Sequence, residues 1–117
     1  DRHINVIACT DDVLWVSFAE MCIAPRSASD CIELAREYHT VLLARVPVMT
    51  EKLDDAARRF INLVDEFYDR CVKLIISADA PIHELYQGKK LAFEFQRTQS
   101  RLLEMQSHEY LEREHRP

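Results

Sequence analysis

Short apolar runs separated by turn-forming residues mark the beginning of the chain. Residues 4–8 and 13–18 are mostly apolar, and a Thr-Asp-Asp sequence lies between them. β-Branched and aromatic residues in short runs on either side of a turn are typical of paired strands. The pattern predicts an N-terminal β-hairpin with Trp15 and Phe18 in the core, followed by one helical turn that ends near Pro25.

Two longer stretches repeat apolar residues at helical spacing. In the first, Ser27 and Asp30 have the spacing of a capping box, in which the two residues satisfy backbone amides at the helix start. The apolar residues behind them recur at i, i+3, i+4 and i+7: Cys31, Leu34, Ala35 and Tyr38. In the second, Thr50 can cap a helix that has an unbroken apolar stripe. The stripe consists of Leu53, Ala56, Ala57, Phe60, Ile61, Val64, Phe67 and Tyr68.

Two nearly continuous apolar runs, residues 41–46 and 72–77, flank the second helix. Short runs of this kind are typical of strands that are covered on both faces in a parallel sheet. A strand, a helix and a strand with short connections form a βαβ unit, whose crossover is right-handed. After a short turn that Gly88 closes, residues 91–95 alternate and predict an extended segment, and a polar helix is expected over residues 97–111. The expected buried side of that helix consists of Leu102, Met105 and Tyr110.

These elements predict the α/β fold class in a single domain, residues 1–117. The domain would contain the N-terminal β-hairpin, the βαβ unit with parallel strands and the C-terminal helix. A chain of 117 residues, 48% of them hydrophobic, is long enough to bury one continuous core. The chain opens at Asp1 rather than Met, which indicates a processed or excised piece.

The composition disfavours several kinds of function. The net charge of -5 argues against nucleic-acid binding, because a phosphate footprint requires clustered Lys and Arg. No run of about 18 apolar residues could span a bilayer, so membrane contact would be at most peripheral. Four cysteines without a C-x-x-C pair favour reduced, mostly buried thiols, and five histidines without an H-x-x-x-H pair predict no metal site. Gly88 is the only glycine, so neither G-x-x-x-x-G-K-[ST] nor G-x-G-x-x-G occurs.

Five blocks of residues carry a resemblance to a known family. They are Phe18-x-x-x-Cys22-x-x-Pro25-Arg26-Ser27-x-x-Asp30; Ala57-Arg58-Arg59-Phe60-Ile61 with Leu63-Val64-Asp65-Glu66-Phe67-Tyr68; Val72-Lys73-Leu74 with Ser77-Ala78; Glu84-Leu85-Tyr86; and Phe93-Glu94-Phe95-x-Arg97-Thr98-x-Ser100-Arg101-Leu102-x-Glu104-Met105-Gln106-Ser107. In this order the blocks cover nearly all of the chain. They resemble the C-terminal third of the ZapE-type ATPases, AAA+-like P-loop enzymes with a bacterial cell-division member and mitochondrial relatives.

The resemblance implies that the chain is the C-terminal portion of a larger ATPase whose Walker A and Walker B motifs lie upstream of Asp1. The complete protein would bind ATP and Mg²⁺ in the cytoplasm, could form homo-oligomers, and would have the division-ring protein FtsZ as its client. The 117 residues would form a regulatory and interaction domain that contacts the upstream ATPase core. We expect no cofactor site in this piece and no activity of the piece alone. Its first βαβ strand ends in Arg45-Val46-Pro47, without the metal-binding carboxylate of a Walker B strand.

Two other functions compete with this interpretation. The first is a free-standing α/β protein-interaction module without ATPase activity, and a P-loop in the parent open reading frame would discriminate it from the ATPase. The second is a small thiol enzyme that uses one of the cysteines. It has little support, because no constellation of His and Cys is visible in the sequence.

Four arginines are candidates for a catalytic role in the complete enzyme. Arg58 and Arg59 are neighbours on the second helix, and Arg97 and Arg101 are one helical turn apart. An arginine can stabilise the charge of a transferring phosphoryl group, acting as a finger or a sensor from outside the P-loop. The alternative is that these arginines form ion pairs on solvated helix faces. The candidate partners are Asp54, Asp55, Asp65, Glu94 and Glu104.

Three further charged residues have structural interpretations. Asp65 lies in the middle of the second helix and is most simply solvated. Glu66 beside it could pair with Arg59 or with Arg70. Arg26, next to the capping box, is expected to be structural.

Overall fold

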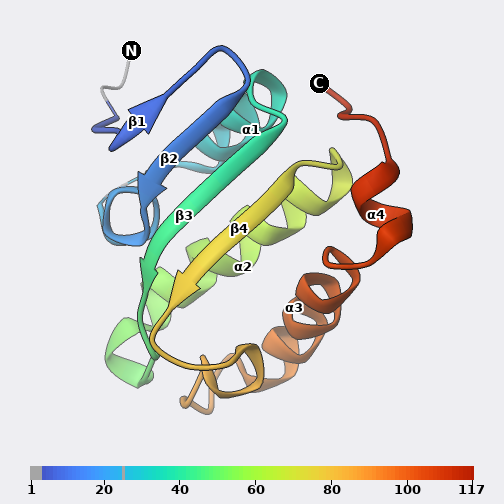
Figure 1. Cartoon of the computed structure of the whole chain (residues 1–117). Helices are drawn as coiled ribbons and strands as arrows, with labels where there is room; N and C mark the ends of the chain where they lie inside the picture. The colour runs from blue at the N-terminus through green and yellow to red at the C-terminus, as the bar shows by residue number, and fades with distance from the viewer. Residues whose placement is uncertain (1–3, 25) are drawn as a thin grey trace.

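The computed structural model, which describes residues 4–24 and 26–117, has a four-stranded sheet with helices packed on one face (Figure 1). The strands are β1 (Ala8–Cys9), β2 (Val13–Ser17), β3 (Thr40–Val46) and β4 (Lys73–Ala78), in the order β1-β2-β3-β4. The helices are α1 (Ala28–Glu37), α2 (Asp54–Asp69), α3 (Ala92–Glu104) and α4 (His108–Glu112). Short helical turns precede the first three: η1 (Ala19–Ile23), η2 (Glu51–Leu53) and η3 (Ile82–Glu84). The α/β class predicted from the sequence is confirmed.

The N-terminal hairpin is confirmed, but its first strand is shorter than predicted. β1 and β2 are antiparallel, and the Thr10 hydroxyl oxygen closes the turn by accepting from the Val13 amide at 3.1 Å. The strand expected over residues 4–8 is confined to Ala8–Cys9. The reason lies at Asn5, whose amide donates to a carboxylate oxygen of Glu20 at 3.1 Å and so leaves the sheet for η1. The helical turn expected before Pro25 is η1, and Pro25 itself lies outside the described residues.

Two βαβ units follow one another along the chain. The predicted unit is confirmed, because β3 and β4 are parallel and α2 connects them. A second unit was missed: β2 and β3 are also parallel, with η1 and α1 in their connection. The strands are added in one direction across the sheet. Right-handed crossovers that progress in one direction place their helices on the same face, and α1 and α2 both lie behind the sheet in Figure 1.

The core lies between the sheet and these helices. Alternate strand residues point into it, in two rows: Leu14, Val41 and Leu74, then Val16, Leu43 and Ile76. On the helix side the Phe60 ring of α2 lies 6.0 Å from that of Phe18 and 6.2 Å from that of Phe95, measured between ring centroids. The apolar stripe predicted for the second helix is therefore confirmed as a core face.

The opposite face of the sheet is open, which contradicts two expectations. Trp15 was expected in the core, but its side chain points to the other face and is 43% exposed. β4 was expected to be covered on both sides, but it is an edge strand and Ile75 is 56% exposed. Nearly continuous apolar runs did not imply coverage here, because the chain places α1 and α2 on one side only. We call the surface formed by Trp15, Leu42 and Ile75 the open face.

The segment expected to be extended, residues 91–95, is the beginning of a helix. Leu91 precedes α3 as its N-cap residue, and the buried residues Phe95, Thr98 and Leu102 lie on the inner side of that helix. Positions 91 and 95 are four residues apart, so they fit one helix face as well as one strand face. Phe93 between them is 82% exposed. The alternation was too short to distinguish the two structures.

The polar helix expected over residues 97–111 is divided in two. α3 ends at Glu104 and α4 begins at His108, with the Ser107 hydroxyl oxygen accepting from the Tyr110 amide at 3.2 Å as a cap. The break lets the buried Tyr110 turn back to the junction of α2 and β4. The Tyr110 hydroxyl donates to the Val72 carbonyl oxygen at 2.7 Å and lies 3.1 Å from the Phe67 carbonyl oxygen.

The ends of α2 differ from the sequence expectation. Thr50 precedes η2 instead of α2 and makes no side-chain cap bond, because the chain forms a 3-10 turn before the helix. At the other end the Cys71 amide donates to the Tyr68 carbonyl and the Val72 amide to the Phe67 carbonyl. This pair of bonds is a Schellman motif, and Cys71 adopts the left-handed conformation (φ 57°) that glycine usually supplies.

The capping box at the start of α1 gives a first testable prediction. The Ser27 amide donates to Asp30 Oδ2 at 3.0 Å, and both halves of the box are formed. Ser27→Ala should lower the free energy of unfolding by about 1 kcal/mol through loss of the cap. Urea denaturation measures the change, with Ser100→Ala on the exposed side of α3 as the control. Equal stability of the two variants would contradict a stabilising role for the cap.

Candidate functional site

The four candidate arginines lie on α2 and α3, two helices that pack against each other. Arg58 forms an ion pair with Glu94, with 3.5 Å between Arg58 Nη2 and Glu94 Oε2. Both side chains are close to half exposed. An ion pair at this exposure is worth about 0–1 kcal/mol, so it is a weak constraint on Arg58.

Asp65 brings the other pair of arginines together. Its Oδ2 atom accepts from Arg97 at 3.1 Å, and its Oδ1 atom accepts from Arg101 at 2.5 Å. The expectation that Asp65 is simply solvated is therefore wrong: its carboxylate is partly buried between two guanidinium groups. The alternative that paired the candidate arginines with carboxylates such as Asp65 is confirmed for Arg97 and Arg101. Which arginines Asp65 would choose could not be predicted, because the two come from a helix 32 and 36 residues further along the chain.

Arg101 is held more firmly than Arg97. Its guanidinium carbon lies 4.9 Å from the centroid of the Tyr68 ring, in a cation–π arrangement. The Tyr68 hydroxyl donates to Glu104 at 2.8 Å, and this hydrogen bond raises the pKa of Tyr68. Arg97 has only Asp65 among these contacts and is 61% exposed. Of the two arginines, Arg97 is the one that can turn toward a partner.

Arg59 has a different environment from its neighbour Arg58. Its Nη1 atom donates to the backbone carbonyl of Cys22 at 2.9 Å, which ties α2 to η1. Of the two arginines that could pair with Glu66, Arg59 and Arg70, the structure shows Arg70, whose Nε atom lies 2.5 Å from Glu66 Oε2. Arg59 is thus partly buried and makes a structural contact.

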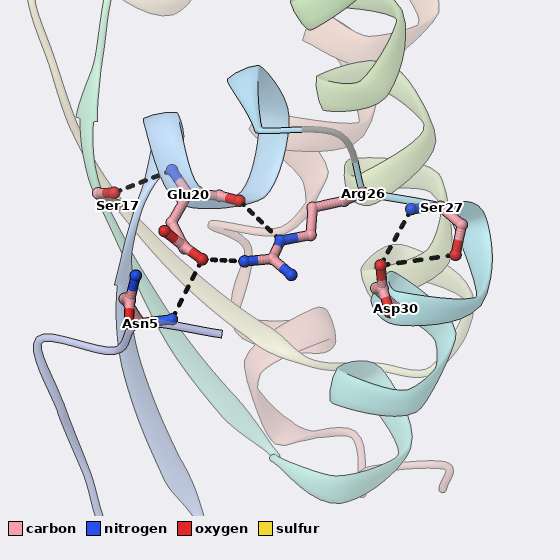
Figure 2. A network of polar contacts seen from close by, with 6 residues as sticks. All are labelled: Asn5, Ser17, Glu20, Arg26, Ser27 and Asp30. Carbon is pink, nitrogen blue, oxygen red and sulfur yellow. Dashed lines mark hydrogen bonds and ion pairs between the residues drawn. The ribbon is translucent and has the colours of Figure 1, made fainter. Parts of the chain in front are cut away.

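A polar network around Arg26 was not found from the sequence (Figure 2). Arg26 forms an ion pair with Glu20 and also donates from Nε to the Glu20 carbonyl oxygen at 3.1 Å. Glu20 accepts the Asn5 amide as well, and the Ser17 hydroxyl oxygen accepts from the Glu20 amide at 3.1 Å. The Asn5 hydrogen bond and the Arg26 charge lower the pKa of Glu20.

These contacts give the network a structural role, as expected for Arg26. They join the N-terminal segment, the end of β2, η1 and the start of α1 (Figure 2). Glu20 and Arg26 are six residues apart across a turn, a spacing that no helical or strand pattern selects. Only the path of the chain between them brings the two charges together.

Nucleophilic chemistry finds no support among the buried thiols. Cys22, Cys31 and Cys71 are buried, and Cys9 is exposed. Burial raises the pKa of Cys31 to about 11 and raises that of Cys22 even further. A thiol with a raised pKa is scarcely ionised near neutral pH and is a poor nucleophile. The described residues also contain no group of three or more His, Cys, Asp or Glu side chains that could hold a metal ion.

An apolar groove runs between β4 and the inner side of α3. Its volume is about 280 Å³, and most of its lining is aliphatic. The aliphatic residues are Leu74, Ile76, Ile82, Leu85, Leu102 and Met105. Among the described residues, no charged side chain lines this groove. In the described part of the chain, no helix is long and apolar enough to cross a membrane.

Comparison with known proteins gives the arrangement a context. The family described as AFG1-like ATPase has a model that matches residues 1–114. The cell division protein ZapE of Escherichia coli K12 is 54% identical over 114 residues, which cover 97% of this chain and 30% of that protein. The zebrafish protein named lactation elevated protein 1 homolog B is 35% identical, over 93% of this chain and 28% of its own length. No solved structure matches the chain significantly.

The chain thus spans less than a third of the length of these relatives. The family match covers residues 1–114, the range that contains β1 to α4.

Proposed function

This chain belongs to the AFG1-like ATPase family, and on that premise we propose that it is the C-terminal regulatory and interaction domain of a ZapE-type ATPase. The family match over residues 1–114 carries the proposal. In this proposal the complete polypeptide binds ATP and Mg²⁺ through motifs outside these residues, and hydrolyses ATP. A role in cell division is taken from the name of the ZapE relative. An FtsZ-type client and a location in the cytoplasm stay predictions from the resemblance.

The contacts of the arginines support a role in positioning and interaction. Arg59 and Arg101 are held by a backbone carbonyl, a carboxylate and an aromatic ring within the chain. Arg97 and the exposed Phe93 lie one helical turn apart on the outer side of α3. Aromatic residues and arginines carry much of the binding energy in protein interfaces. We therefore propose this outer side of α3 as the surface for a protein client.

The experiment that tests the proposed function uses the complete polypeptide that contains these residues. We expect it to hydrolyse Mg-ATP, and we expect removal of the 117 residues to change that rate or abolish the response to FtsZ. Phe93→Ser should weaken FtsZ binding and leave basal hydrolysis intact, with Leu111→Ser on α4 as the matched control. A complete polypeptide without ATPase activity would favour the free-standing interaction module.

A catalytic role for one arginine remains a proposal within this framework. A finger must extend from its own domain to a phosphate bound elsewhere, which requires an exposed side chain that is weakly held. Arg97 meets this requirement best and Arg58 next, whereas Arg59 and Arg101 are partly buried by structural contacts.

The 117-residue chain alone should bind no ATP measurably. It has no glycine-rich phosphate loop, and β3 ends with Arg45 and Val46 instead of the metal-binding carboxylate of a Walker B strand. Isothermal titration calorimetry with Mg-ATP checks this, with the complete polypeptide as the positive control. Binding of the isolated chain in the micromolar range would reveal a nucleotide site within these residues.

A further inference from the structure

We propose that the open face of the sheet is the surface on which the remaining part of the longer ATPase polypeptide docks. This inference rests on the proposed function, since it requires that longer polypeptide. It assigns the contact between the two parts to three side chains, Trp15, Leu42 and Ile75.

These three residues form one continuous apolar row. Trp15 pairs with Leu42, and Leu42 pairs with Ile75, in the register of three adjacent parallel strands. Trp15 and Ile75 are large apolar side chains with about half of their surface in contact with solvent. In the same register the neighbouring rows of this face are Val13, Thr40 and Lys73 on one side and Ser17 and Ala44 on the other. The rim is therefore mixed, and its polar members are Thr40, Lys73 and Ser17. An apolar centre with polar groups around it is the usual composition of a protein interface.

The topology explains why the chain cannot cover this face itself. In parallel sheets both faces are almost always covered, because the crossover helices lie on them. Here the strand order β1-β2-β3-β4 is sequential, so α1 and α2 lie on one face. α3 packs on α2 and α4 reaches the junction of α2 and β4, so neither covers the open face (Figure 1). The sheet is therefore one half of a two-sided α/β arrangement.

The remaining polypeptide is a better occupant than a second copy of the chain. About 70% of the length of the ZapE relative lies outside the match, given that 30% is covered, which is ample for a covering layer. A covalently connected partner also reaches the surface at high effective concentration. Two copies of this chain would bring together net charges of -5 each and repel one another.

Thiol labelling at the row tests the proposal directly. Ile75→Cys is introduced in a Cys9→Ser background, because Cys9 is exposed and the other three cysteines are buried. The labelling rate at residue 75 is read by peptide mass spectrometry, in the 117-residue chain and in the complete polypeptide. We expect labelling to be at least about tenfold slower in the complete polypeptide, as for a site removed from solvent. Leu103→Cys, on an exposed position of α3, is the control and should label equally in both.

Hydroxyl-radical footprinting at Trp15 keeps the test valid if Ile75→Cys fails to fold, since it uses the unsubstituted protein. Equal modification of Trp15 and equal labelling of residue 75 in both proteins would overturn the proposal. Protection that appears in the isolated chain as its concentration rises, together with a dimer in sedimentation, would also overturn it and would identify a second copy as the occupant.

An ATPase assay on the same preparation distinguishes failure of the docking proposal from failure of the proposed function. Hydrolysis without protection refutes docking alone, and protection without hydrolysis refutes the proposed function alone.

Discussion

Replacing Phe60 by alanine should lower the free energy of unfolding by about 3–5 kcal/mol, a large part of the stability of a small domain. Phe60 is fully buried at the centre of α2. Its ring lies between those of Phe18, which follows β2, and Phe95 of α3, so one side chain joins three parts of the core. Truncation would leave a cavity that none of these rings can fill without moving the segment that carries it.

Urea denaturation of the two proteins measures this loss. Phe93→Ala is a matched control, because it removes the same atoms from the same residue type at a position that is 82% exposed. Its effect should stay within about 0.5 kcal/mol. A loss below about 1 kcal/mol for Phe60→Ala would mean that α2 docks loosely on the sheet.

Replacing Arg97 by alanine in the complete ATPase should lower kcat by about 10³-fold, if Arg97 is the arginine that reaches the nucleotide. A finger stabilises charge in the transition state more than in the ground state, so ATP affinity should change little. Among the described residues, Arg97 would give up its ion pair with Asp65, which is worth under about 1 kcal/mol because the Arg97 side chain is 61% exposed. Steady-state hydrolysis and a separate nucleotide-binding measurement distinguish the two effects.

The same substitution at Arg58, Arg59 and Arg101 completes the test. Arg59→Ala should mainly destabilise the contact between α2 and η1, because its guanidinium donates to the Cys22 carbonyl. Lys90→Ala, at an exposed position before α3, controls for the loss of a positive charge alone. If all four arginine variants keep kcat within about threefold, or roughly 0.7 kcal/mol, the catalytic proposal is refuted.

Sequence patterns predicted those elements that depend on residues close together in the sequence. The capping box of α1 and the apolar stripe of α2 could be predicted, because a cap and a helix face are determined by residues within a few positions of one another. The unit formed by β3, α2 and β4 followed from two apolar runs around that stripe. Residues 91–95 were misjudged, because positions four apart share a face in a helix and in a strand alike.

Features that depend on the path of the chain could not be predicted in the same way. The exposure of Trp15 follows from helices lying on one side of the sheet only, which no window around Trp15 shows. Asp65 was among the candidate partners of the arginines, but its choice of Arg97 and Arg101 depends on how α3 crosses α2. The ion pair between Glu20 and Arg26 depends in the same way on the turn that separates them.

The sequential order of the strands also determines when the structure can form during synthesis. Each strand pairs with the one that the ribosome made before it, so the sheet can grow from β1 to β4 as the chain emerges. The contacts of α4 can form only later. Tyr110 of α4 bonds to the Val72 carbonyl, 38 residues earlier, and to that of Phe67, 43 residues earlier. The Tyr110 hydroxyl can therefore bridge the α2–β4 junction only after α4 has been translated.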